Sequence, residues 1–116
     1  MHASEYQKQA ARTLSAKPDF TITGEEVMRI WCALGLVGEA GELAELVKKG
    51  ILHRHGVDKT ELRKELGDVL WYLAAICTQF DIPLSEVMEH NIRKIDMRYP
   101  KGFTTKDSKK RVDVKK

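Results

Sequence analysis

Two pairs of carboxylates, Glu39 with Glu42 and Glu65 with Asp68, are the residues whose types and spacing could do chemistry. The members of each pair are three residues apart, which places both side chains on one face of a helix, about a turn apart. If the two helices pack side by side, four oxygen donors converge. Oxygen donors without clustered His or Cys suit the hard cations Mg²⁺ and Mn²⁺, which proteins commonly use to bind phosphates. The pattern therefore predicts a divalent-metal site for a phosphorylated substrate.

The alternative is that these acids simply face water, as most glutamates on helices do. A helical projection places Glu39 among apolar neighbours and Glu42 at the edge of the same sector. Glu65 and Asp68 both project into the apolar part of a helix whose residues 66–77 are nearly all apolar. An unpaired carboxylate in such a place costs several kcal/mol, and no run of Lys or Arg shares these arcs. We therefore expect a bound metal to compensate these charges.

The ExxE and ExxD pairs are followed by Asn91, Lys94 and the segment Arg98-Tyr99-Pro100. Together these motifs resemble the MazG-like nucleotide pyrophosphohydrolases, an all-α family, from about residue 35 to about residue 103. The resemblance implies hydrolysis of a nucleoside triphosphate to the monophosphate and pyrophosphate. It also implies that the catalytic groups and the Mg²⁺ ligands are the same four acids, Glu39, Glu42, Glu65 and Asp68. One of the four would act as general base, and the sequence does not select it.

Four further residues are candidates for substrate binding. Asn91 and Lys94 lie one turn apart on one helix face and would suit sugar hydroxyls and phosphate oxygens, although an exposed polar pair would look the same. The resemblance places Tyr72 near the base or sugar, and core packing is its alternative role. Arg98 joins this set through the resembling segment.

Helical periodicity and end signals predict four helices and no strand, at residues 4–14, 23–50, 58–80 and 83–99. Thr23 with Glu26, and Asp58 with Glu61, have the form of capping boxes. A loop is expected at residues 15–22. The fold class predicted is an all-α antiparallel bundle of about four helices whose core is completed in a homodimer or homotetramer.

Three glycines, Gly35, Gly38 and Gly41, fall inside the second predicted helix. Each costs roughly 1 kcal/mol relative to alanine in a helix interior, so a reason for them is expected. The sequence leaves three open: close approach of another helix, close approach of the phosphates of a ligand, or a kink.

The composition indicates one domain of 116 residues with a net charge of +3. Residues 106–116 hold six Lys or Arg against two Asp, so the rest is close to neutral. We expect a MazG-like domain at residues 1–105 and a flexible basic tail at 106–116. No helix carries a basic face for a nucleic-acid groove, so a nucleic-acid partner is not expected.

The two cysteines lack zinc spacing, and no signal peptide or membrane-length apolar run is present, which predicts a cytoplasmic protein without a membrane partner.

The function predicted is Mg²⁺-dependent hydrolysis of a (d)NTP to (d)NMP and pyrophosphate, with Mn²⁺ as a substitute ion, in house-cleaning of the nucleotide pool. Two alternatives stay open. One is an enzyme like the all-α dUTPases, and the other is a non-catalytic module that senses nucleotides or dimerises. The base and sugar preferences and the number of metal ions are not determined by the sequence.

Overall fold

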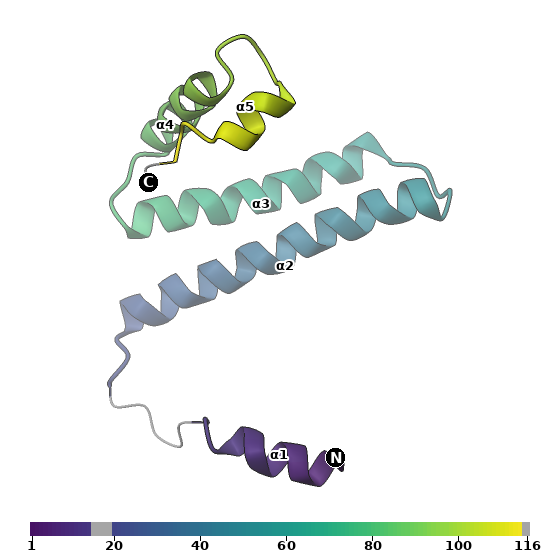
Figure 1. Ribbon diagram of the computed structural model, residues 1–116, viewed down its shortest axis with the longest axis vertical. Helices are drawn as coiled ribbons and strands as arrows, with labels where there is room; N and C mark the ends of the chain where they lie inside the picture. Colours follow the sequence, from purple (N-terminus) through teal and green to yellow (C-terminus); the bar gives the residue numbers. More distant parts are fainter. Residues whose placement is uncertain (15–19, 115–116) are drawn as a thin grey trace.

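The computed structural model describes residues 1–14 and 20–114, and within them the chain is all-helical (Figure 1). An isolated bridge between Pro100 and Gly102 is the only β-type pairing in these ranges. The all-α prediction is therefore confirmed. The helices are α1 (Ala3–Ala11), α2 (Gly24–Leu52), α3 (Lys59–Gln79), α4 (Leu84–Arg98) and α5 (Thr105–Lys110). Most of the loop expected at residues 15–22, and the last two residues of the tail, lie outside the described residues.

The two longest helices, α2 and α3, form an antiparallel hairpin that supplies nearly all of the tertiary packing of the chain (Figure 1). α2 begins with the predicted capping box. The Glu26 amide donates to Thr23 Oγ1, and the Thr23 amide donates to Glu26 Oε1, each with a donor–acceptor distance of 3.1 Å. α3 begins differently from the prediction. Asp58 Oδ1 accepts from the amide of Thr60 at 2.7 Å, without a reciprocal bond from Glu61. Both helix starts are nevertheless fixed by the residues that the sequence indicated.

α4 and α5 lie on the side of α3 away from α2, whereas α1 stands apart from the hairpin (Figure 1). Pro83 immediately precedes α4, and the helix ends at Arg98, before Pro100 as predicted. Regular structure continues beyond the expected domain boundary, because α5 spans residues on both sides of it and is capped by Thr104. The division of the chain at residue 105 stays a prediction.

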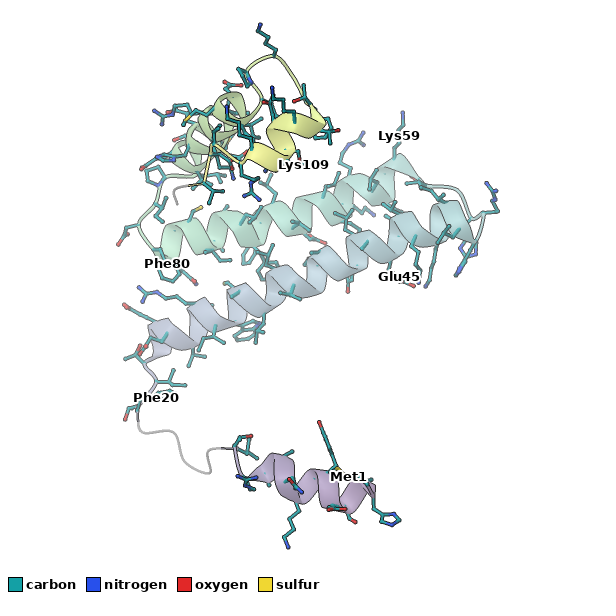
Figure 2. The ribbon with its side chains drawn as sticks, viewed as in Figure 1. Met1, Phe20, Glu45, Lys59, Phe80 and Lys109 are labelled. Atoms are coloured by element: carbon teal, nitrogen blue, oxygen red, sulfur yellow. The ribbon has the colours of Figure 1, made fainter. Side chains whose placement is uncertain are left out.

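Very little of the apolar surface is covered within one chain. Cys32 is the only fully buried hydrophobic residue among those described, while Trp31, Leu34, Val37 and Trp71 are all more than 60% exposed. Side chains project from both sides of the hairpin in Figure 2. The radius of gyration is 20.5 Å, against about 13 Å for a compact chain of this length.

No helix in the described part of the chain is both long enough and apolar enough to cross a membrane.

Candidate metal and substrate site

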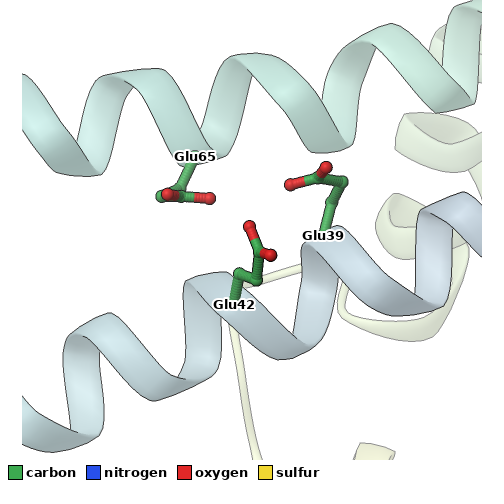
Figure 3. Close-up of side chains that lie close together, drawn as sticks. All are labelled: Glu39, Glu42 and Glu65. Atoms are coloured by element: carbon green, nitrogen blue, oxygen red, sulfur yellow. The ribbon is translucent and has the colours of Figure 1, made fainter.

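Three of the four predicted acids meet between α2 and α3. Glu39 and Glu42 extend from α2 toward Glu65 on α3, as Figure 3 shows. One carboxylate oxygen from each residue lies within 4.8 Å of the other two. The spacing of Glu39 and Glu42 puts both on the inner face of α2, and the antiparallel hairpin brings Glu65 opposite them. We call these three residues the acidic cluster.

The acidic cluster has unsatisfied acceptors, and no counter-charge comes to it from the residues that the structure describes. Glu39 Oε2 and Glu65 Oε2 are buried and have no hydrogen-bond partner in the described part of the chain. Within residues 1–14 and 20–114 the ion pairs of Lys and Arg go to Glu45 and Asp113, not to the cluster. Buried carboxylate oxygens without partners are costly, and a hard divalent cation is the ligand that oxygen donors of this kind accept. The residues present therefore fit such an ion.

The electrostatics of Glu39 reflect this crowding. Burial first, and then the charges of Glu42, Asp68 and Glu65, raise the pKa of the Glu39 carboxyl above its ordinary value of 4.5. Each of these causes disfavours the ionised form. In the absence of a cation, the neighbouring carboxylates therefore disfavour ionisation of Glu39.

Asp68 is placed differently from the prediction. It is close enough for its charge to act on Glu39, but it lies outside the 4.8 Å group and its side chain is exposed. The expectation that it is carried into the interior is wrong for a single chain. α3 is covered by α2 along one side only, so a residue on the flank of the apolar sector stays open to solvent.

Tyr72 lies along the α2–α3 seam, the line along which the two helices pack against each other. It is half-buried and lies one turn beyond Asp68 on α3. Its ring packs edge-on against Trp71 with the ring centroids 5.0 Å apart. Trp71 itself is 62% exposed, so it does not belong to a core of the single chain. Tyr72 is thus near the acids, where a substrate held by them could reach it.

Asn91 and Lys94 lie together on α4, away from the acids. Both line an open depression of about 340 Å³, to which Ile82, Val87, Glu86 and His90 also contribute. None of the four acids lines it. Asn91 and Lys94 share this depression, but one chain does not show them joined to the acidic cluster, and their role in substrate binding stays a prediction.

Arg98 contacts the C-terminal segment of its own chain. Its Nε lies 3.6 Å from Asp113 Oδ1, its Nη2 donates to the Ser108 carbonyl at 3.2 Å, and its guanidinium lies 5.1 Å from the Tyr99 ring centre. The Asp113 side chain is only 3% exposed and also lies 3.6 Å from Arg111 Nε. The sequence pattern does not indicate this contact of Asp113, because a lone acid in a basic segment carries no signal of its partner.

Comparison with known proteins identifies the class. The MazG nucleotide pyrophosphohydrolase domain matches residues 31–103, which include every candidate site residue. The chain belongs to the MazG nucleotide pyrophosphohydrolase family. This membership makes it an enzyme of the nucleoside triphosphate pyrophosphatase class, a hydrolase.

Two curated proteins are similar to this MazG-family chain. It is 42% identical over 76 residues to the Gene 37 protein of Mycobacterium phage L5, covering 62% of this chain and 67% of that protein. It is 34% identical over 89 residues to human dCTP pyrophosphatase 1, covering 70% of this chain but only about half, 51%, of the human protein. No solved structure matches.

Proposed function

We propose that the chain hydrolyses a (d)NTP to the (d)NMP and pyrophosphate with Mg²⁺ as its ion and Mn²⁺ as a substitute. The observation that carries the proposal is the acidic cluster itself. Three carboxylates lie within 4.8 Å of one another, and two of their oxygens are buried without a partner. A triphosphate is a polyanion, so it would approach such a cluster only together with a cation.

In this proposal Glu39, Glu42 and Glu65 hold the ion, and Asp68 completes the set from its exposed position beside Glu39. When bound, Mg²⁺ would neutralise the triphosphate and lower the pKa of a bound water. The carboxylates would hold the ion, and one of them accepts the proton of the attacking water. The oxygen of that water bonds to phosphorus at the α–β anhydride as the bond to the bridging oxygen breaks, which gives the monophosphate and pyrophosphate.

The remaining candidate residues have substrate roles in the proposal. Tyr72 contacts the base or sugar, and Asn91, Lys94 and Arg98 contact sugar hydroxyls and phosphate oxygens. The assembly proposed is a homodimer or homotetramer, supported by the apolar surface left open on a single chain. The proposed setting is the cytoplasm, where the enzyme would remove unwanted nucleotides from the pool.

The test is pyrophosphate release from a panel of nucleoside triphosphates, with and without Mg²⁺. The name of the human relative gives dCTP as its substrate, so dCTP belongs in the panel. dUTP belongs in it because a dUTPase-like enzyme is the alternative. Equal amounts of monophosphate and pyrophosphate, stopped by EDTA, are expected. Orthophosphate as the first product would contradict the proposal. Activity on dUTP alone would favour a dUTPase-like enzyme, and nucleotide binding without any turnover would favour a sensing module.

A further inference from the structure

Next to the acids along the α2–α3 seam lies one close contact between the helices. Glu39 and Asp68 face each other closely enough for their charges to interact. Gly35 precedes Glu39 by one turn on α2, and Tyr72 follows Asp68 by one turn on α3. Because the helices are antiparallel, both steps lead in the same direction. Gly35 and Tyr72 therefore form the layer of the seam that follows the acids.

The ring of Tyr72 occupies the place of the side chain that Gly35 lacks. A Cβ atom at Gly35 would overlap Tyr72 Cε1, and it would lie 2.5 Å from Cζ and 2.9 Å from the hydroxyl oxygen. All three atoms belong to the aromatic ring or its hydroxyl, which move only as a rigid unit. Any side chain at position 35 would therefore displace the ring from the seam.

The other two glycines of α2 that the sequence analysis identified do not share this property. Among residues 1–14 and 20–114, a Cβ at Gly38 or Gly41 would meet nothing within 4 Å. Both are exposed on the chain, whereas Gly35 is half-buried under Tyr72. The close approach of another helix thus explains Gly35 alone, and Gly38 provides a matched control on the same helix.

The position of the ring relative to the acids determines what it can contact. One helical turn is about 5.4 Å, so the ring lies one layer along from Glu39 and Asp68, within reach of the part of a ligand that extends from these acids toward it. The neighbour of the phosphates in a nucleoside triphosphate is the sugar and its base. An aromatic face stacks on a base, and a phenol hydroxyl can hydrogen-bond either group. Trp71 packs edge-on against the ring from another side, with the ring centroids 5.0 Å apart.

We propose that Gly35 is a positioning residue for substrate binding, because its missing side chain lets the Tyr72 ring lie across the seam against the nucleoside part of the substrate. This inference rests on the proposed function, since it takes the acids as the site of the phosphates. Gly35 itself touches no substrate and acts through Tyr72.

The first experiment compares Gly35→Ala with Gly38→Ala in steady-state kinetics on the preferred nucleotide. Gly35→Ala is expected to raise KM by about threefold to tenfold, the size of one lost aromatic contact, and to change kcat less. Inhibition by pyrophosphate, which has no nucleoside, should be unchanged, as should the Mg²⁺-induced rise in Tm. Gly38→Ala should leave all of these values at the parental level. An equal rise in KM for both variants would overturn the proposal.

The second experiment repeats Gly35→Ala in a Tyr72→Leu background. Tyr72→Leu alone should raise KM and leave pyrophosphate inhibition unchanged. Adding Gly35→Ala to it should change KM by less than about twofold, because the ring that it displaces is already gone. The smaller leucine should also restore folding if Gly35→Ala is poorly folded. A separate, additive effect of Gly35→Ala on KM would show a role independent of Tyr72 and overturn the inference.

A third measurement separates this inference from the proposed function. If the parent releases no pyrophosphate from any nucleotide, the proposed activity fails, and binding of a non-hydrolysable (d)NTP analogue is measured by calorimetry instead. The same order of affinities is expected there, with Gly35→Ala weaker than the parent and Gly38→Ala equal to it. Equal affinities for all three proteins would contradict the role of Gly35.

Discussion

Glu39 has the clearest electrostatic consequence at the scale of single residues. Its pKa is raised in the folded chain, so the folded state holds the proton more tightly than the unfolded state does. The contribution of Glu39 to stability without metal should therefore be most favourable at low pH, and fall as the pH rises from the ordinary value of 4.5 through the raised folded-state pKa.

Glu39→Gln should remove this contribution, so that the difference in Tm between variant and parent grows in favour of the variant as the pH rises. Thermal melts in EDTA from about pH 4 to pH 8 measure it. Glu61→Gln, at an exposed glutamate, is the control and should follow the parent. If the Tm of Glu39→Gln instead differs from that of the parent by the same amount at every pH in this range, the pKa of Glu39 is not raised in the folded protein.

The acidic cluster also predicts how stability responds to metal. Without metal, Glu65→Gln keeps the shape of the side chain and removes one repelling charge, so it should melt no lower than the parent. Added Mg²⁺ binds the folded state only and should raise the Tm of the parent by several degrees, because saturation at about 100 times Kd adds about 2.7 kcal/mol. The variant should respond much less. Equal responses of the two proteins would argue against metal binding at Glu65.

The convergence of these acids could be predicted because helical spacing alone puts two carboxylates on one face. Their exposure could not be predicted as well. A helical projection indicates which side of α3 is apolar, but it does not say which neighbour covers that side. Asp68 is exposed because α2 covers only part of the apolar side of α3. The contact of Tyr72 with Gly35 likewise depends on the distance between two helices, which a one-helix pattern does not contain.

At the scale of elements, local signals located the helices well. The starts of α2, α3 and α4 follow from the sequence because each helix begins directly after a residue that marks a helix start. These residues are Thr23, Asp58 and Pro83. The contact of the C-terminal segment with Arg98 joins residues 15 positions apart through a single buried carboxylate. Nothing in the local pattern indicates that pairing.

This contact predicts that Asp113 holds the C-terminal segment in place. Asp113→Asn removes the charge that faces both Arg98 and Arg111, and leaves Arg98 without a counter-ion. Amide protection in α5 should fall about tenfold, which corresponds to about 1.4 kcal/mol, in hydrogen-exchange mass spectrometry. Asp96→Asn, at an exposed aspartate of α4, should have no such effect. Unchanged exchange in Asp113→Asn would mean that the ion pair does not anchor the segment.

At the scale of the whole molecule, the shape of a single chain supports the proposed assembly. An extended chain with exposed Trp31, Leu34, Val37 and Trp71 presents far more apolar surface than a stable monomer usually does. The sequence predicted a core shared between copies because helices with apolar residues on several faces need more than one neighbour.

Light scattering should accordingly report at least a dimer at micromolar concentration. Arginine or lysine in place of Leu34 should shift the equilibrium toward smaller species, since a charge would be buried in the contact. A monodisperse monomer of the parent chain would remove the shared-core account.

The central claim is that the acidic cluster is a divalent-metal site that hydrolyses nucleoside triphosphates to pyrophosphate. The most direct measurement is Mg²⁺-dependent pyrophosphate release by the parent and by Glu65→Gln, each first shown to be folded and of the same assembly size. The account predicts stoichiometric monophosphate and pyrophosphate from the parent, and a loss of about two orders of magnitude or more in Glu65→Gln. Near-parental pyrophosphate release by Glu65→Gln, or full release by the parent in EDTA, would contradict it.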